Sequence, residues 1–198
     1  MRISYRIIVT TVRVFMKIFY NYEIINADKL DNIANTIIAA NHISANDPPF
    51  LGGIIQQEIF YLAKSELFRN KLFGSILKYF NCIPIRRGVV DRSALIKVKE
   101  VLLKGNSILI FPEGTRNSNK PKPGIGKIAI ETATDVLPIF IKNSDDFKKC
   151  FLKKEKMKFI IGDIIDVTPF IKKGETKENY REFSAFVLKK INELENDS

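Results

Sequence analysis

Residues 36–50 read TIIAANHISANDPPF, and the patterns of a strand and of a helix start meet in this stretch. Thr36–Ala40 is a short apolar run rich in isoleucine, which predicts a buried strand. Asp47 followed by Pro48 is a typical helix start, with the aspartate as N-cap and the proline at the first helical position. A buried strand that leads through a short polar loop into a helix is the repeating unit of an α/β domain.

The same alternation continues along the rest of the chain. Short apolar runs predict strands, and between them lie stretches with the spacing of amphipathic helices. This order implies one α/β domain with a largely parallel or mixed sheet flanked by helices. In such sheets, ligands usually bind beyond the carboxyl ends of the strands. The expected strands are 36–40, 58–63, 82–85, 107–111, 136–142 and 158–164, and the expected helices are 48–56, 65–80, 91–103, 126–134 and 177–194.

The composition is that of an ordinary globular protein with a basic surface. The chain has 198 residues, of which 45% are hydrophobic, and its formal charge is +10. The length favours one domain, and the composition excludes a disordered chain. The charge favours an anionic partner, although a solvated basic surface explains it equally well. Two cysteines and one histidine argue against a disulfide framework and a zinc site.

The N-terminal stretch, RISYRIIVTTVRVFMKIFY at 2–20, is apolar but carries a narrow basic stripe. Its uncharged runs are far shorter than the ~20 residues that a membrane-spanning helix needs. The pattern favours residues 1–22 as an amphipathic helix at a lipid interface, followed by one domain at 23–198. The alternative is a helix packed on the core with a basic solvent face. On a helix, four basic side chains fall within an arc of about 60°: Arg2, Arg6, Arg13 and Lys17.

His42 is the only histidine in the chain, and Asp47 follows it by five positions. A carboxylate that holds Nδ1 would let Nε2 remove a proton from a bound hydroxyl group. Positions five apart on a regular helix point about 140° away from each other, so the pair can meet only in an irregular turn. The two prolines favour such a turn. The alternative is that Asp47 only begins the helix and His42 merely follows the strand, and the two descriptions are compatible.

A second polar stretch, FPEGTR at 111–116, also follows an expected strand. It supplies a glycine turn, a carboxylate and a guanidinium group. Arg116 could bind a phosphate group through two hydrogen bonds. Arg86 and Arg87 in IPIRRG follow another expected strand and could reach the same anion, although each arginine alone is more typical of a solvated surface.

Together these motifs resemble those of the glycerolipid acyltransferases, specifically the 1-acyl-glycerol-3-phosphate acyltransferases. The first signature, N-H-x-x-x-x-D, is intact at 41–47, and the third, F-P-E-G-T-R, is complete at 111–116. The second matches the stretch from Lys64 to IPIRRG, where Asn81 stands in a position that often holds glycine. The fourth, an apolar strand around proline, matches VLPIF at 136–140.

The resemblance implies a role for each matched residue. His42 would be the general base for the free hydroxyl of the acceptor, and Asp47 would orient the imidazole. Arg87 would bind the phosphate of the acceptor, with Arg116 nearby. The other implied substrate-binding residues shape the acceptor site or line the acyl chain: Glu113, Gly114, Thr115 and Pro138.

The resemblance also implies a reaction and its partners. An acyl group would move from a thioester donor, acyl-CoA or acyl-carrier protein, to lysophosphatidate, giving phosphatidate in phospholipid biosynthesis without a metal or a tightly held cofactor. The partners would be an anionic membrane surface and these substrates, and no nucleic acid is expected because no readout motif is present. Another lyso-lipid or an aminolipid acceptor remains open. So does a non-catalytic membrane-binding relative, although a binding protein has no need of His42 and Asp47.

The expected location follows from the N-terminal stretch. It has neither the uninterrupted apolar core nor the small-residue cleavage site of a signal peptide. We therefore expect a peripheral, monotopic protein at the cytoplasmic face of the cell membrane.

Overall fold

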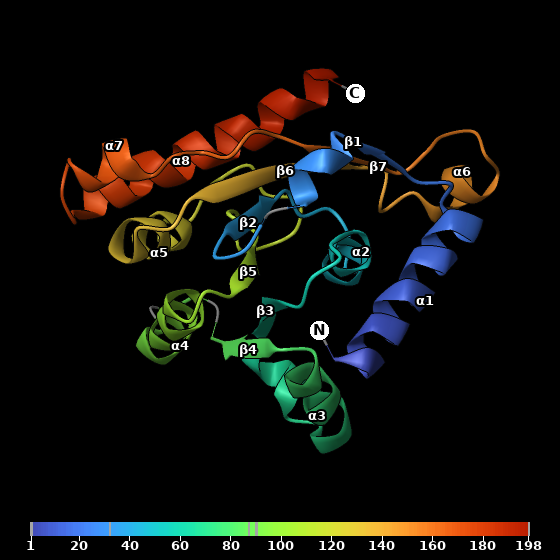
Figure 1. Cartoon of the computed structure of the whole chain (residues 1–198), viewed down its shortest axis with the longest axis horizontal. Coiled ribbons are helices and arrows are strands. Elements are labelled where there is room, and N and C mark those ends of the chain that lie inside the picture. Colours follow the sequence, from blue (N-terminus) through green and yellow to red (C-terminus); the bar gives the residue numbers. More distant parts are fainter. Residues whose placement is uncertain (1, 32, 87, 90, 198) are drawn as a thin grey trace.

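Seven strands pair into one sheet, in the order β1-β7-β6-β2-β5-β3-β4, in a computed structural model of the chain. The structure describes residues 2–31, 33–86, 88–89 and 91–197. Helices cover both faces of the sheet (Figure 1). The strands are β1 Glu23–Ile25, β2 Ile37–Ala40, β3 Ile59–Lys64, β4 Cys82–Ile85, β5 Ser107–Ile110, β6 Val136–Lys142 and β7 Lys158–Ile161.

The helices follow the strands in regular alternation over most of the chain. The α-helices are α1 Ile3–Phe19, α2 Asp47–Ile54, α3 Lys71–Tyr79, α4 Arg92–Leu103, α5 Gly124–Thr132, α6 Phe147–Phe151, α7 Thr168–Ile171 and α8 Lys177–Glu193. Short 3-10 helices occupy Ala27–Leu30, Ser65–Phe68 and Leu194–Asp197.

The pairing of the strands is parallel except between β6 and β7, which are antiparallel. The sheet is therefore mixed and mostly parallel, and the predicted α/β fold is confirmed. All four residues of β2 are fully buried, because helices cover both of its faces. Ile37 and Ala39 face the core under α4, α5 and α8, whereas Ile38 and Ala40 face the core under α1 and α2.

Helix α1 packs against α2 and leaves an apolar face outside. Tyr5 and Met16 are fully buried. A Cβ at Gly53 of α2 would lie 2.9 Å from Met16 Cε, so this glycine lets the two helices approach closely. The helix thus packs on the core, but its outward face is apolar rather than basic. The outward residues are 52–80% exposed: Ile3, Ile7, Val14 and Ile18.

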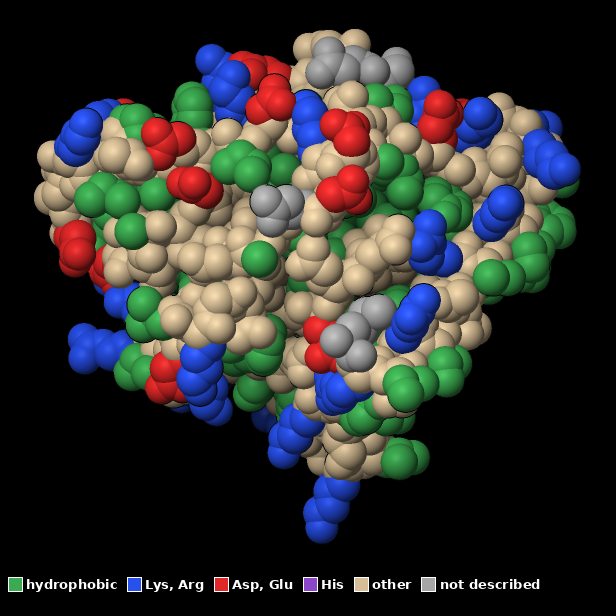
Figure 2. Space-filling view, viewed as in Figure 1, with side chains coloured by type: hydrophobic (Ala, Val, Ile, Leu, Met, Phe, Trp, Pro, Cys, Tyr) green, Lys and Arg blue, Asp and Glu red, His purple; other side chains and the backbone are tan. Residues whose placement is uncertain are grey.

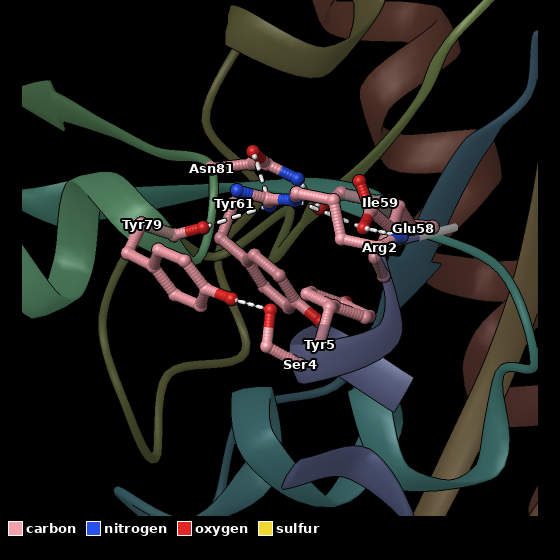
Figure 3. Close-up of polar contacts among 8 residues, drawn as sticks. All are labelled: Arg2, Ser4, Tyr5, Glu58, Ile59, Tyr61, Tyr79 and Asn81. Atoms are coloured by element: carbon pink, nitrogen blue, oxygen red, sulfur yellow. Dashed lines mark hydrogen bonds and ion pairs between the residues drawn. The ribbon is translucent and has the colours of Figure 1, made fainter. Parts of the chain in front are cut away.

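Polar contacts hold the start of α1 against the residue before β3 and against the turn between α3 and β4 (Figure 3). The backbone N and Nε of Arg2 donate to Glu58 Oε1 over 2.7 and 3.0 Å. Nη2 of Arg2 donates to the carbonyl of Tyr79 at 2.8 Å and to Asn81 Oδ1 at 3.1 Å. The guanidinium also lies 4.7 Å from the centre of the Tyr79 ring. Arg2, one of the four basic residues of the predicted stripe, is therefore engaged in contacts within the protein.

Asn81 takes the backbone conformation that explains glycine at this position in the family signature. Its φ is +58°, in the left-handed region that glycine adopts freely and asparagine tolerates better than most residues. Its side chain is also used, because Oδ1 accepts a hydrogen bond from Arg2. Asn81 therefore adopts the turn conformation that glycine would adopt before β4. Its side chain adds a contact with the start of α1 that glycine could not make.

The expected helix at 65–80 is wrong in one respect, because two helices occupy this stretch. The 3-10 helix ends at Phe68, and α3 begins at Lys71. Asn70 lies between them in an extended conformation, and its side chain accepts a hydrogen bond from Phe73 N at 3.0 Å. This N-cap starts a new helix where the spacing of apolar residues alone indicates a continuous one.

Candidate active site

The site lies where three neighbouring strands end. β2 pairs in parallel with β5 on one side and with β6 on the other, so their carboxyl ends meet at the same edge of the sheet. The segments that follow these strands are 41–47, 111–117 and 143–144. Asn117 N donates to the carbonyl of His42 at 3.0 Å, which joins the first two segments. This edge is where an open α/β sheet usually binds its ligand.

His42 and Asp47 meet in the irregular turn that their spacing requires. His42 Nδ1 lies 2.8 Å from Asp47 Oδ2, and both side chains are buried, with 8% and 0% exposed. The imidazole also stacks on the Phe111 ring, with centroids 4.1 Å apart and planes tilted by 17°. An ionised carboxylate that accepts from Nδ1–H leaves Nε2 with its lone pair, so the ring is arranged as a base.

Asp47 serves the turn that precedes it rather than the helix that follows. It is the first residue of α2, and the N-cap position belongs to Asn46, so the predicted N-cap role of Asp47 is wrong. Its Oδ2 also accepts from the backbone N of Ile43 and of Ser44, both at 2.8 Å. Its Oδ1 accepts from Ser144 Oγ at 2.5 Å. The carboxylate is therefore held by four donors, and its direction toward His42 is fixed.

Asn41 fixes the other end of the same turn. Its side-chain amide donates to the carbonyl of Ile141 at 2.9 Å and accepts from the backbone N of Ile141 at 2.7 Å. This pair of bonds continues the β2–β6 ladder by one step beyond the strand. The first residue of the N-H-x-x-x-x-D signature thus positions the backbone from which His42 projects.

Glu113 is a buried carboxyl group close to this pair. Its residue is 4% exposed, and within the described part of the chain its Oε2 has no hydrogen-bond partner. Burial raises the pKa of Glu113 to about 7, and the charge of Asp47 acts in the same direction. Hydrogen bonds from the backbone N–H groups of Glu113 and His42 act in the opposite direction. The side chain can therefore accept or release a proton near neutral pH.

The rest of FPEGTR forms a tight turn at the surface. Gly114 has φ +69°, and its N donates to the carbonyl of Phe111 at 3.0 Å. A side chain at this position would be strained, which explains the glycine. Thr115 and Arg116 are exposed just beyond the turn. Arg116 is therefore available to an anion that approaches this edge of the sheet.

The other predicted arginines lie on the edge strand. β3 separates β4 from β5, so Arg86 starts roughly 10 Å from the FPEGTR strand. The backbone N of Arg86 and its Nε donate to Asp91 Oδ2 at 2.9 and 3.4 Å. The guanidinium of Arg86 is therefore paired with Asp91. Arg87 lies outside the described residues, and its role in binding phosphate stays a prediction.

Pro138 is buried inside β6, opposite Ala39 of β2. A Cβ at Gly162 would lie 2.8 Å from the Pro138 ring, so the two residues pack closely. The structure thus gives Pro138 a packing contact in the sheet, and its role beside an acyl chain stays a prediction.

Ser144 is a residue of this site that the sequence motifs do not reveal. It is 1% exposed, and it lies two residues beyond the end of β6. Its hydrogen bond to Asp47 spans 97 positions in the sequence. The rule that ligands bind beyond strand ends points to the residues after β6. Only the pairing of β6 with β2, which the structure shows, identifies Asp47 as the partner of Ser144.

The fold and this geometry define a class of protein. Among the described residues, no serine or cysteine side chain is hydrogen-bonded to the imidazole, whose contacts are Asp47 and Phe111. A base held in this way suits an enzyme that activates a hydroxyl group of its substrate rather than one of its own.

A family model described as Acyltransferase matches residues 21–142, and the chain belongs to this family. The 1-acyl-sn-glycerol-3-phosphate acyltransferase of Bacillus subtilis is 31% identical over 97% of both chains. The lyso-ornithine lipid O-acyltransferase of Pseudomonas aeruginosa is 34% identical over 54% of this chain and 43% of its own length. The crystal structure of PlsC, the LPA acyltransferase of Thermotoga maritima, has a TM-score of 0.68 at 23% identity, covering 98% of this chain and 80% of that one. The resemblance drawn from the motifs is thereby confirmed.

Proposed function

We propose that this enzyme transfers a fatty acyl group from a thioester donor to the free hydroxyl of 1-acyl-glycerol-3-phosphate. The observation that carries the proposal is the buried His42–Asp47 pair, with Nδ1 bound to the carboxylate at 2.8 Å. The name and the nearly full-length match of the Bacillus subtilis relative support lysophosphatidate as the acceptor. Acyl-CoA and acyl-carrier protein both remain candidate donors, and the product enters phospholipid biosynthesis.

The reaction needs only one protein base. Nε2 of His42 takes the proton of the acceptor hydroxyl as the oxygen attacks the thioester carbonyl carbon. The imidazolium is stabilised by Asp47, and it then returns the proton to the departing sulfur as the C–S bond breaks. The new ester and the free thiol account for every atom. No metal or bound cofactor takes part in this scheme.

Positive charge near the site supports a phosphate-bearing acceptor. Arg116 is exposed beyond the FPEGTR turn, on the loop that Asn117 ties to His42. Guanidinium groups bind phosphate through paired hydrogen bonds. Arg116 and Arg87 are therefore our proposed ligands for the acceptor phosphate. Glu113, Gly114 and Thr115 would shape the space between them and His42.

We place the enzyme on the cytoplasmic face of a membrane as a peripheral protein. Among the described residues, no helix combines the length and apolar character that crossing a bilayer requires. The outward face of α1 is apolar, with Ile3 80% and Ile18 62% exposed, and basic residues flank it. Such a helix suits the interface of an anionic bilayer. The enzyme could then reach an acceptor whose acyl chain stays in the bilayer.

A direct test offers the purified protein lysophosphatidate with either acyl-CoA or acyl-carrier-protein thioester and measures phosphatidate. We expect activity that His42→Ala reduces by a factor of about 10⁴ or more, because base catalysis and its alignment are both lost. Asp47→Asn should lower kcat with less effect on KM, whereas Arg87→Ala should chiefly raise the KM of the acceptor. Full activity in His42→Ala would refute the assignment of the base.

An aminolipid acceptor is the second candidate. It is favoured by the match to the lyso-ornithine lipid O-acyltransferase of Pseudomonas aeruginosa. That acceptor has no phosphate, so its turnover should not depend on Arg87 or Arg116. Comparing kcat/KM of the native protein for the two acceptors distinguishes the two candidates, and Arg116→Ala should lower this ratio only for lysophosphatidate.

A further inference from the structure

The connection between β6 and β7 has an unusual composition. Residues 143–157, here called the α6 loop, read NSDDFKKCFLKKEKM and contain five lysines and three acidic residues. Antiparallel neighbours such as β6 and β7 can be joined by a two-residue turn. The loop is instead long enough to hold α6, which is anchored on the core by the buried side chain of Cys150.

The α6 loop and α1 share a cluster of four phenylalanines. Phe19 of α1 has its ring centre 6.4 Å from Phe147 and 6.0 Å from Phe151, and Phe15 lies 4.7 Å from Phe19. Phe147 and Phe151 stack on each other at 5.6 Å. The cluster is not buried, since Phe15, Phe147 and Phe151 are 42%, 45% and 51% exposed. It extends the outward apolar face of α1 beyond the C-terminal end of that helix.

Exposed lysines follow Phe147 and Phe151 closely in the sequence. Lys148, Lys153 and Lys154 are exposed and, among the described residues, form no ion pair. Two of the three acids in the loop, Asp146 and Glu155, are paired with Lys149. Figure 2 shows hydrophobic side chains along the right-hand edge, on the side where Figure 1 places α1 and α6, with Lys and Arg side chains set among them.

We propose that the α6 loop is a second membrane contact, which docks beside α1 on an anionic phospholipid bilayer. Aromatic rings favour the interface between headgroups and acyl chains, and lysines near an anionic surface add electrostatic attraction. The inference rests on the proposed function in one respect, that the acceptor is taken from a bilayer.

The position of the loop explains what a second contact would achieve. Ser144, at the start of the loop, holds Asp47, and Phe147 follows three residues later. The chain between these two residues can span at most about 11 Å. Docking through the loop would therefore bring the His42–Asp47 pair to the membrane surface, whereas α1 alone would leave the molecule free to rotate about the helix axis.

The chain contains no tryptophan, so a single introduced indole reports the environment of one position. In Phe151→Trp, we expect the emission to shift to shorter wavelength on adding vesicles of phosphatidylcholine and phosphatidylglycerol. Lipids brominated on their acyl chains should then quench it. Leu103→Trp on α4 is the matched control, because Leu103 is 76% exposed and α4 lies far from α1 and α6 in Figure 1. Its emission should stay unchanged.

Co-sedimentation with the same vesicles measures the contribution of charge. Replacing Lys148, Lys153 and Lys154 together by glutamine should weaken binding on the order of 100-fold, at about fivefold for each lysine near the surface. Replacing the exposed Lys97, Lys104 and Lys120 in the same way is the control, and binding should change little.

Two outcomes would overturn the proposal. One is a bound Phe151→Trp protein whose emission is neither shifted nor quenched, which would mean that α1 docks without the loop. The other is an emission already shifted without vesicles in a protein that sediments as a dimer, which would assign the surface to a second copy of the chain. Neither readout depends on acyl transfer, so failure of the proposed reaction would leave the result intact.

Discussion

Replacing Glu113 with glutamine should change how the stability of the fold depends on pH. Burial raises the pKa of Glu113 to about 7, against an ordinary value of 4.5. Between these two values the folded state holds a proton that the unfolded state has lost, so stability falls as the pH rises from 4.5 to 7. At 1.36 kcal/mol per pH unit the loss is at most about 3 kcal/mol, and about 2 kcal/mol once partial solvent screening is allowed for.

Glutamine has nearly the same shape and stays neutral at every pH. At pH 8 the Glu113→Gln variant should therefore be more stable than the native protein by about 2 kcal/mol, or roughly 4–8 °C in Tm for a domain of this size. Near pH 4 the two proteins should unfold at nearly the same temperature.

Thermal unfolding followed by circular dichroism at both pH values measures this difference. Comparing the two proteins at each pH cancels the titration of groups they share. Glu100→Gln, at an exposed site on α4, is the control, and its difference from the native protein should be the same at both pH values. The argument that the buried carboxyl is costly when ionised would be refuted by a Glu113→Gln variant that is less stable than the native protein at pH 8. It would also be refuted if the Tm of the variant differed from that of the native protein by the same amount at both pH values.

Three further substitutions test the packing and the positioning of the site. Ser144→Ala removes the described donor to Asp47 Oδ1, so we expect kcat to fall about tenfold. The unfolding free energy should fall by about 1–3 kcal/mol. An unchanged kcat would contradict a positioning role. Gly126→Ala would place a Cβ 2.1 Å from the carbonyl of Tyr180, so denaturant titration should show a loss of about 3 kcal/mol as α5 and α8 separate. At Asn81, whose φ is positive, alanine should destabilise by about 1 kcal/mol more than glycine, and the reverse order in thermal unfolding would show that the backbone is relaxed there.

The local patterns of the sequence predicted several strands of the sheet well. The apolar run before His42 became β2, and the runs at 82–85 and 136–142 became β4 and β6 with the expected bounds. β2 and β6 are continuous apolar stretches because both faces of the sheet are covered where they lie. The meeting of His42 and Asp47 was also predictable, since five positions can be bridged only by an irregular turn, and such a turn follows β2.

Short elements that depend on distant partners could not be predicted in this way. β1 has only three residues and exists because Glu23–Ile25 pairs with β7, far along the chain. α6 has only five residues, and its packing depends on α1, because Phe147 and Phe151 contact the Phe19 ring. The contact between Ser144 and Asp47 is of the same kind. Propensity and periodicity are local quantities, whereas these features are set by neighbours in space.

The fastening of α1 has a consequence for the order of events during synthesis. Arg2 contacts Glu58, Tyr79 and Asn81, which lie 56, 77 and 79 positions later in the chain. β2, at the centre of the sheet, also needs β6, whose last residue is Lys142. At typical rates of translation, roughly 10 to 30 seconds pass before these partners have been made. During that interval the nascent helix exposes its core-facing side as well as its outward isoleucines, so the proposed contact of α1 with lipid would be strongest before the domain has folded.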